Sequence, residues 1–231
     1  MKSLIIIPTY DEKENIEKLV KQITDLGFFI LVIDDNSPDG TGEILEKLKL
    51  SNERLSVIHR EKKLGLGTAY IQGFKWALKR DFDYIFTMDA DFSHNPEYLT
   101  SFVEKLSEFD LVVGARYVKG GGVVNWPFHR KIISRCGSLY ARTILGFQVK
   151  DCTSGFMGFR RKVLEKIDLD DIKSEGYGFL IEMKYRTFKL GFRIYQNPII
   201  FVDRTAGKSK ISKNIIWEAI FLVWKLKFTI K

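Results

Sequence analysis

The chain has 231 residues, 45% of them hydrophobic and 13% aromatic, which is enough apolar surface for one large packed domain and excludes a disordered protein. Its two cysteines, Cys136 and Cys152, lack CxxC spacing and do not cluster with the three histidines, which argues against a zinc site and favours a reducing compartment. No apolar run reaches 18 residues and the N-terminus does not resemble a signal peptide, so we expect no transmembrane helix.

The net charge of +8 is unevenly distributed along the chain. Segments 111–150 and 204–231 together contain fourteen Lys and Arg residues but only one acidic residue, Glu218, so the remainder of the chain is net acidic. An acidic body with two basic segments indicates an interaction with an anionic partner. The alternative is chance segregation of charge on solvated faces, but both segments are also rich in Trp, Phe and Ile.

Apolar runs alternate with helical periodicities through the first half of the chain. The expected strands are 4–7, 29–35, 55–59, 83–88 and 111–115, and the expected helices lie within 14–27, 41–50, 67–80 and 95–106. Asn95 is the expected N-cap of the last of these helices, with Pro96 at its first position. Strands that are apolar on both faces and alternate with helices predict an α/β fold with a mainly parallel, Rossmann-like sheet flanked by helices.

The pattern changes after Arg116. Three glycines at 120–122 predict a loop, and 130–146 a basic amphipathic helix. A loop, a short strand and a helix are expected within 151–164, a helix at 176–191, and a strand region at 192–204. The final segment is apolar on almost all sides between Ile215 and Trp224.

Polar residues follow four of the expected strands. They are Pro8-Thr9-Tyr10, Asp34-Asp35-Asn36, His59-Arg60 and Asp89-Ala90-Asp91. Because open parallel sheets bind ligands at the carboxyl ends of their strands, we expect these residues to converge on one crevice.

Asp89 and Asp91 form an Asp-x-Asp triplet, which suits a hard cation such as Mg²⁺ or Mn²⁺. The alternative is that Asp91 only stabilises the N-terminus of the following helix. The chain has no Walker lysine loop and no GxGxxG, and the glycine-rich stretch 61–69 matches neither fingerprint. A nucleotide held by strand ends and a metal indicates a nucleotide-sugar site.

A set of motifs in fixed order resembles a known family. They are IIPTYDEKENI, VIDDNSPDGTGEI, HREKKLGLGTAYIQGF, MDADFSHNP, GARYVKGGGV, WPFHRKIISR, DCTSGFMGFRR, EGYGFLIEM and NPIIFVDRTAGKSKI. With them the sequence resembles glycosyltransferases of the GT-A fold, family 2, and more narrowly the dolichol-phosphate (polyprenol-phosphate) mannose synthases. It departs from the family at Asp11, where Asn is usual, and ends at Lys231, where many relatives continue into transmembrane helices.

The resemblance implies a role for each matching residue. Pro8, Tyr10, Glu12, Ile33 and Asp35 would hold the base and ribose of the donor. Asp89, Ala90 and Asp91 would line the metal and the diphosphate, with Ser93 as a further metal ligand. Arg116, Arg204 and Lys210 would contact the donor, and Arg116, Arg130 and Lys210 the acceptor phosphate. For Arg130 and Lys210 the alternative is an ordinary surface or lipid-facing charge.

The implied reaction moves mannose from GDP-mannose to a dolichyl or polyprenyl phosphate with inversion, and depends on Mg²⁺ or Mn²⁺. Asp89, Asp91, Arg116 and Arg204 are the expected catalytic residues, because a metal and fixed cations stabilise the charge that develops on the leaving diphosphate. The acceptor phosphate is already anionic, so we expect no dedicated base. Asp151 and Glu182 also lie in family-like motifs, but a direct catalytic role for them is not favoured.

Two other functions stay open at this point. UDP-glucose is the alternative donor. A non-catalytic nucleotide-binding or nucleic-acid-binding protein is disfavoured, because the chain has no nucleic-acid motif and the strand-end carboxylates would repel a phosphate backbone. We therefore expect no nucleic-acid partner.

The lipid acceptor implies contact with a bilayer. We expect a catalytic domain over 1–210, including an interfacial helix near 127–146, and a C-terminal amphipathic helix over 211–231. Attachment would be peripheral, on the cytoplasmic side, with a possible role for a membrane-anchoring partner. The alternative is that the apolar residues of these helices belong to the core.

Overall fold

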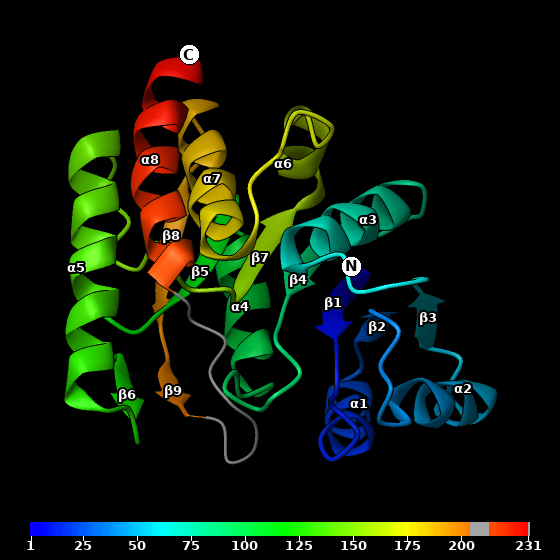
Figure 1. Ribbon diagram of the computed structural model, residues 1–231. Coiled ribbons are helices and arrows are strands. Elements are labelled where there is room, and N and C mark those ends of the chain that lie inside the picture. The colour runs from blue at the N-terminus through cyan, green and yellow to red at the C-terminus, as the bar shows by residue number, and fades with distance from the viewer. Residues whose placement is uncertain (204–212, 231) are drawn as a thin grey trace.

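A central sheet of seven strands, in the order β3-β2-β1-β4-β7-β5-β8, runs through the protein (Figure 1). The computed structural model describes residues 1–203 and 213–230, and side chains up to 203 and from 221. The strands are β1 (Ser3–Thr9), β2 (Phe29–Asp34), β3 (Leu55–His59), β4 (Tyr84–Thr87), β5 (Leu111–Ala115), β7 (Met157–Arg160) and β8 (Ile194–Pro198). Only β7 runs antiparallel to the other strands of this sheet. The predicted mainly parallel α/β sheet is confirmed.

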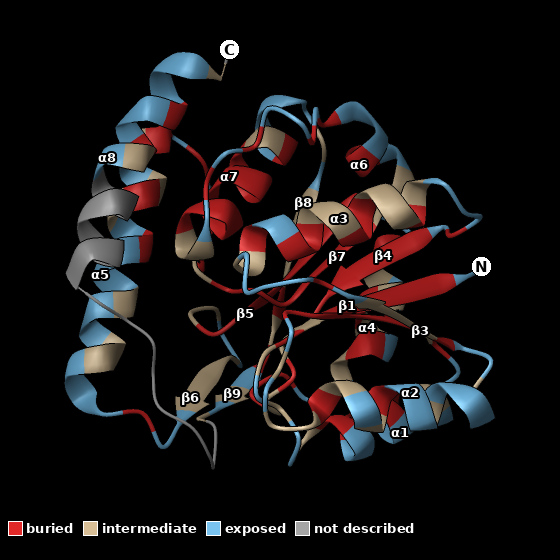
Figure 2. Cartoon of the chain, turned by 45° about the vertical axis from the view of Figure 1, so that its right-hand side comes forward, coloured by how far each residue is buried: buried red, intermediate tan, exposed pale blue. Residues whose placement is uncertain are grey.

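Helices cover both faces of the sheet. On one face lie α1 (Ile16–Asp25), α2 (Thr41–Ser51) and α4 (Tyr98–Leu106); on the other lie α3 (Leu66–Leu78), α6 (Arg161–Lys166) and α7 (Gly176–Lys189). Alternate residues of β1 point to the two layers: Leu4 and Ile6 to the α3 side, Ile5 and Ile7 to the α1 side. Because both faces are covered, the inner strands of the sheet are almost wholly buried (Figure 2), while the edge strands β3 and β8 are only partly buried.

Two further helices and a small sheet complete the fold. α5 (Phe128–Leu145) and α8 (Lys213–Thr229) lie side by side at one edge, next to α7 (Figure 1). Leu145 of α5, Val223 and Leu226 of α8, and Tyr185 of α7 share a third apolar cluster. Below them β6 (Gly122–Val124) pairs in parallel with β9 (Ile200–Val202). Part of α8 therefore belongs to the core. No helix in the described ranges is long and apolar enough to cross a membrane.

Two local expectations are corrected. α4 begins at Tyr98 with Glu97 at its N-cap, so Asn95 is not the cap. Its Oδ1 instead accepts a hydrogen bond from the Glu97 backbone N–H at 3.0 Å, which makes a turn before the helix. The glycine loop is also shorter than expected, because Gly122 already belongs to β6.

Candidate functional site

The carboxyl ends of β1, β2 and β3 meet around Asp34. Its buried carboxylate accepts hydrogen bonds from Thr9 Oγ1 at 3.2 Å and from Ser37 Oγ at 2.5 Å, and lies 3.5 Å from His59 Nδ1. The expected convergence of these three strand ends is therefore confirmed. Asp34 holds the ends together.

The neighbouring Asp35 forms a buried ion pair with Arg60, at the end of β3. Its Oδ2 also accepts the backbone N–H groups of Leu64 and Gly65, at 3.2 and 3.3 Å. The Arg60 guanidinium in turn donates to Thr68 Oγ1 at 2.7 Å. Asp35, predicted to contact the donor, is thus held in a fixed orientation at the end of β2.

Four other predicted donor-binding residues lie close to the ends of β1 and β2: Pro8 in β1, Tyr10 and Glu12 in the loop that follows it, and Ile33 in β2. Lys63 Nζ lies 3.6 Å from the centre of the Tyr10 ring, a cation–π contact. The Glu12 backbone N–H donates to Thr41 Oγ1 at 3.1 Å. Pro8 pairs in register with Ile33, which is fully buried in the apolar layer on the α3 side of the sheet.

Asp11 has a left-handed backbone, with φ of +60°, and its N–H donates to Ser37 Oγ at 3.1 Å. Asn and Asp are the non-glycine residues that adopt this conformation most readily. The departure from the family's Asn at Asp11 is therefore compatible with the turn.

Asp89 and Asp91 lie in a tight turn directly after β4. The Asp89 backbone N–H donates to His94 Nδ1 at 3.1 Å, and the Ser93 N–H donates to Asp91 Oδ1 at 3.1 Å. Phe92, between them, has φ of +59°, a conformation that costs free energy for a bulky side chain. A strained turn held by hydrogen bonds at both ends keeps the two carboxylates on one short segment.

Two buried side chains border this turn. Burial, with the nearby Asp89 charge, raises the pKa of Tyr70 well above its ordinary value, so its hydroxyl stays protonated and faces Asp89 Oδ1 at 3.5 Å. Burial lowers the pKa of His94 below 6.5, so the ring is neutral and its Nδ1 accepts a hydrogen bond. Sequence analysis missed both residues, although His94 lies inside the quoted MDADFSHNP motif.

The chemistry of the turn suits a hard divalent cation. Within residues 1–203 and 213–230, no three His, Cys, Asp or Glu side chains are grouped as a metal site. Asp89 and Asp91 supply carboxylate oxygens, and the buried Ser93 Oγ has no hydrogen-bond partner among the described residues. Magnesium typically takes one or two protein carboxylates and completes its shell with water and substrate phosphate, so the donor set fits.

Arg116, at the end of β5, is buried and forms a bidentate ion pair with Asp151. Nε and Nη2 each lie 2.7 Å from a carboxylate oxygen, and Nη2 also donates to Thr153 Oγ1 at 2.9 Å. The Arg116 charge holds the pKa of Asp151 below its ordinary value despite burial, which by itself raises it. Asp151 therefore orients Arg116 at the end of β5.

Arg130, on α5, pairs with Asp203. Its Nη1 donates to both carboxylate oxygens, at 2.8 and 2.9 Å. The Trp126 ring lies between the two arginines, 4.1 Å from the Arg130 guanidinium carbon and 5.1 Å from that of Arg116. The structure thus brings two of the predicted phosphate-binding cations to one aromatic ring, while Arg204 and Lys210 lie outside the described residues.

Glu182 has a structural environment. Its buried carboxylate accepts hydrogen bonds from Ser174 Oγ at 2.5 Å and from Arg186 Nε at 2.7 Å. Both partners are local, so Glu182 fixes the start of α7.

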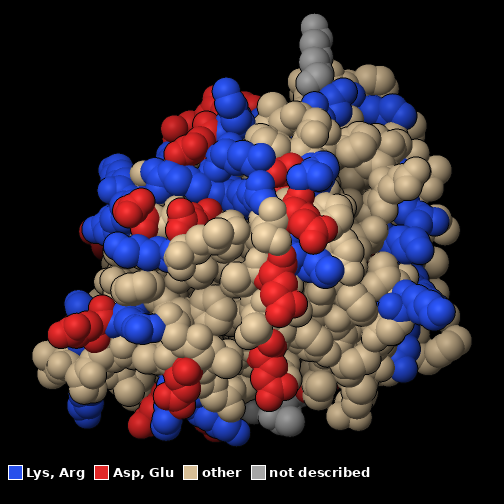
Figure 3. Space-filling model, turned by 180° about the vertical axis from the view of Figure 1, so that it is seen from behind, with Lys and Arg blue, Asp and Glu red and all other residues tan. Residues whose placement is uncertain are grey.

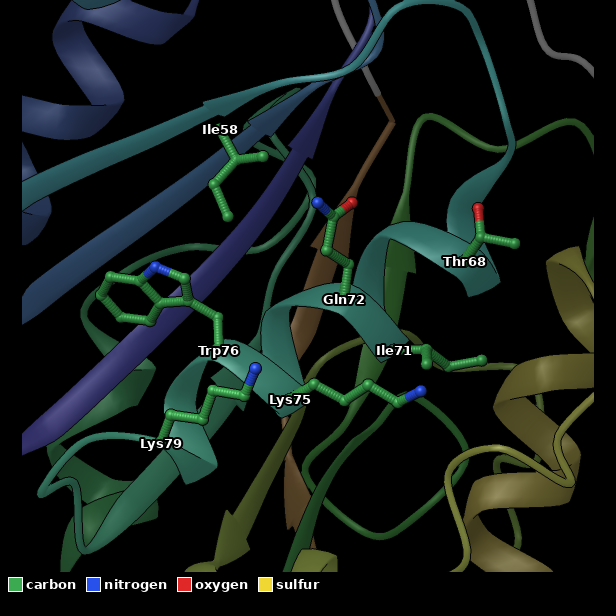
Figure 4. A pocket seen from close by; sticks show the side chains of 7 residues that line it. All are labelled: Ile58, Thr68, Ile71, Gln72, Lys75, Trp76 and Lys79. Carbon is green, nitrogen blue, oxygen red and sulfur yellow. The ribbon is translucent and has the colours of Figure 1, made fainter.

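A hollow of about 440 Å³ lies between the edge strand β3 and α3, and Thr68, the partner of Arg60, is among its lining residues (Figure 4). Ile58, Ile71 and Trp76 form its apolar lining, and Lys75 and Lys79 stand at its rim. Lys75 is paired with Asp170. None of the residues that line the hollow is a carboxylate, and the hollow lies at the β3 edge of the sheet. We therefore do not take it as the candidate site.

Comparison with known proteins identifies the family to which the chain belongs. Residues 4–168 match the sequence model of Glycosyl transferase family 2. The chain is 46% identical over 222 residues to an undecaprenyl-phosphate mannosyltransferase of Micrococcus luteus, with 95% of this chain and 91% of that protein covered. It is 43% identical over 226 residues to a polyprenol monophosphomannose synthase of Mycolicibacterium smegmatis, covering 96% and 85%.

Two solved structures show the same fold at low identity. Glucosyl-3-phosphoglycerate synthase of Mycobacterium tuberculosis, bound to Mg²⁺ and UDP, has a TM-score of 0.69 at 19% identity, covering 98% of this chain and 79% of that one. A mannosyltransferase of Pyrobaculum calidifontis, bound to GDP-Man and Mn²⁺, has a TM-score of 0.59 at 14% identity, covering 97% and 73%.

Proposed function

The chain belongs to glycosyltransferase family 2, and from that premise we propose that it moves mannose from GDP-mannose to a polyprenyl or dolichyl phosphate, with inversion at the anomeric carbon. The observation that carries this proposal is the 43–46% identity to two polyprenol-phosphate mannosyltransferases over nearly the whole chain.

The donor nucleotide would lie over the ends of β1 and β2. Its base and ribose would contact Pro8 at the end of β1, Tyr10 and Glu12 in the following loop, Ile33 of β2, and the fixed carboxylate of Asp35. Because the Arg60 pair and two N–H groups already orient Asp35, this carboxylate needs no rearrangement to accept a ribose hydroxyl. Preorganisation of this kind lowers the entropic cost of binding.

The diphosphate would lie beside Ala90, between Asp89 and Asp91. A bound Mg²⁺ or Mn²⁺ there, held by Asp89, Asp91 and Ser93, would neutralise charge that builds up on the leaving diphosphate. A solved relative in fold contains Mg²⁺ and another Mn²⁺, which supports a divalent ion. Arg116, oriented by Asp151, and Arg204 would place fixed positive charge on the same oxygens.

The acceptor phosphate would approach from the side of α5, toward Arg116, Arg130 and Lys210. A phosphate monoester carries close to two negative charges at neutral pH, so it attacks without a general base. The Arg130–Asp203 pair lies on this route, so the phosphate would compete with Asp203 for the guanidinium. The positive charges of these residues would reduce the repulsion between the acceptor phosphate and the donor diphosphate, which must approach each other.

The lipid acceptor also requires contact with a membrane surface. Phe128, Phe221 and Phe228 are 77%, 72% and 72% exposed and lie on the adjacent helices α5 and α8. Seen from behind, the right-hand edge of the molecule, where these helices lie, shows Lys and Arg but no Asp or Glu (Figure 3). Exposed aromatic rings among basic side chains suit the interface of an anionic bilayer. We assign peripheral attachment on the cytoplasmic side, with a membrane-anchoring partner as a possible addition.

The test compares radiolabelled GDP-mannose and UDP-glucose as donors with a short polyprenyl phosphate, with and without EDTA. We expect organic-phase label from GDP-mannose, its loss in EDTA, and its recovery with excess Mg²⁺ or Mn²⁺. Label from UDP-glucose alone would reassign the donor, and transfer unaffected by EDTA would remove the metal from the proposal.

A further inference from the structure

Lys184 is a fully buried lysine in the middle of α7. An ammonium in the interior is costly unless its charge is paired or its donors are satisfied. No carboxylate in the described part of the chain forms an ion pair with it. Its Nζ instead donates to three backbone carbonyl oxygens, those of Cys152 at 3.1 Å, Ser154 at 2.7 Å and Leu180 at 3.1 Å. An ammonium has three N–H donors, so all three are used.

Two of these three acceptors belong to segment 151–155, which borders the candidate site. Asp151 and Thr153 both bind the Arg116 guanidinium. The Gly155 carbonyl accepts a hydrogen bond from Thr87 Oγ1 at 2.6 Å, and a Cβ added at Gly155 would lie 3.6 Å from Asp89 Oδ1. The segment thus connects Arg116 to the wall beside Asp89, and Lys184 holds it from the core side.

We propose that Lys184 is a positioning residue for sugar transfer, whose ammonium fixes segment 151–155 and thereby the orientation of Arg116 and the wall beside Asp89. Lys184 does not itself reach the reacting atoms. Its role in turnover rests on the proposed function, whereas its effect on segment 151–155 does not.

The charge state of Lys184 makes this role sensitive to pH. Burial lowers the pKa of Lys184 to about 8. The ionisable groups that face it are Cys152 and Asp151 in the segment and Arg116 at the end of β5. The pKa of Asp151 is lowered, that of Arg116 is raised and that of Cys152 is about 12, so none of the three changes charge between pH 7 and 10. Neutral Lys184 has two N–H donors for three acceptors, so the segment is held less firmly above pH 8.

The experiment compares the wild type with Lys184→Met and Lys184→Gln, and uses Lys189→Met, an exposed lysine of the same helix, as the matched control. Mannose transfer from GDP-mannose is measured from pH 6.5 to 9.5. We expect wild-type kcat to fall severalfold with a midpoint near pH 8. At pH 7, both Lys184 variants should lose on the order of tenfold in kcat, since small misplacements near reacting groups are costly.

Two features separate positioning from simple destabilisation. The KM for GDP-mannose should stay within about twofold of the wild type, because the proposed nucleoside contacts lie at β1 and β2 and Arg116 acts mainly on the charge that builds up on the diphosphate in the transition state. The decline near pH 8 should be absent in both Lys184 variants and present in Lys189→Met. A wild-type profile without that decline, or variants that keep full activity and the same profile, would overturn the proposal.

Hydrogen–deuterium exchange at pH 7 supplies a readout that needs no turnover. A peptide spanning 151–155 should exchange faster in Lys184→Met than in the wild type or Lys189→Met. Unchanged exchange there would also overturn the proposal. If the wild type transferred no mannose, the proposed function would fail, and this exchange measurement would still decide whether Lys184 fixes the segment.

Discussion

At the scale of single residues, the site depends on how charges are paired. Asp35 with Arg60 and Arg116 with Asp151 are buried pairs with additional hydrogen bonds. Removing one partner of such a pair leaves an uncompensated charge in the interior. Asp89 and Asp91 lie one residue apart in a strained turn after β4, where Phe92 has φ of +59° and His94 Nδ1 lies 3.8 Å from Asp89 Oδ2. Two carboxylates on one such turn suit a divalent cation.

Asp91→Ala should abolish most transfer while leaving the fold intact. Loss of a ligand to a metal that stabilises the leaving group costs several kcal/mol, so we expect at least about a hundredfold fall in kcat/KM. Circular dichroism and thermal unfolding should match the wild type. The control is Asp81→Ala, an exposed aspartate outside the site, which should transfer normally. Metal-dependent transfer that survives in Asp91→Ala would remove this residue from the mechanism.

Because Lys184 is buried, we predict that the free energy of unfolding rises over the same pH range in which activity falls. Its pKa is about 8 in the folded protein and near 10.5 when unfolded, so between these values the unfolded chain binds more protons and the free energy of unfolding rises with pH. The free energy of unfolding should rise by about 3 kcal/mol in total, with the rise absent below pH 8 and complete above pH 10.5. Denaturant unfolding of the wild type and Lys184→Met at several pH values checks it. A difference between the two proteins that does not vary with pH would contradict the assigned pKa.

At the scale of elements, sequence patterns predicted most of the sheet for a physical reason. The run 111–115, apolar on both faces, is a buried strand, whereas 55–59 is a partly buried edge strand, and the limits of both are those predicted. Residues after parallel strands share one edge, so the meeting of Asp34 with Thr9 could also be predicted. The cap at Asn95 could not, because Asn-Pro favours a turn as well as a helix start.

Other features of the site depend on contacts far apart in sequence. That β7 runs antiparallel between β4 and β5 is not visible in its four residues. The pairing of Arg116 with Asp151 and of Arg130 with Asp203 likewise joins segments 35 and 73 residues apart. The quoted motifs contained all four residues, but they do not tell which arginine pairs with which aspartate.

β7 gives a prediction about packing. A Cβ at Gly158 would lie 2.6 Å from Phe86 Cε1, inside the sheet core, so Gly158→Ala should lower the free energy of unfolding by about 1–3 kcal/mol. The matched change is Gly137→Ala in α5, where a Cβ meets nothing within 4 Å and helix propensity improves. Denaturant unfolding of both variants checks the pair. Equal effects would contradict the assigned register of β7 beside β4.

At the scale of the whole molecule, the candidate site and the helices α5 and α8, which we propose face the membrane, lie on connected parts of one fold. α5 carries Arg130 toward the site and Phe128 toward solvent, and it packs against α8 through the third apolar cluster. An acceptor whose phosphate enters the site while its lipid stays in a bilayer needs a phosphate-binding residue and a membrane-binding residue close together. In the proposal, the basic segment 111–150 therefore contacts the acceptor twice: Arg130 binds its phosphate and Phe128 lies in the bilayer that holds its lipid.

The double substitution Phe128→Ser with Phe228→Ser should weaken binding to vesicles that contain anionic lipid. Losing two exposed aromatic anchors removes apolar contact with the bilayer while leaving the core clusters untouched. Vesicle flotation measures the effect. Leu50→Ser, on α2 and 90% exposed, is the control and should float as the wild type does. Equal flotation of all three proteins would place the membrane contact elsewhere.

The most direct test of the central claim is the product itself. Purified protein, radiolabelled GDP-mannose, Mg²⁺ and a short polyprenyl phosphate are incubated together, and the lipid product is extracted and its anomeric configuration determined by NMR. We predict a mannosyl phosphate lipid whose configuration at the anomeric carbon is opposite to that of the donor. Label that stays in the aqueous phase, or a product that retains the donor's configuration, would contradict the account.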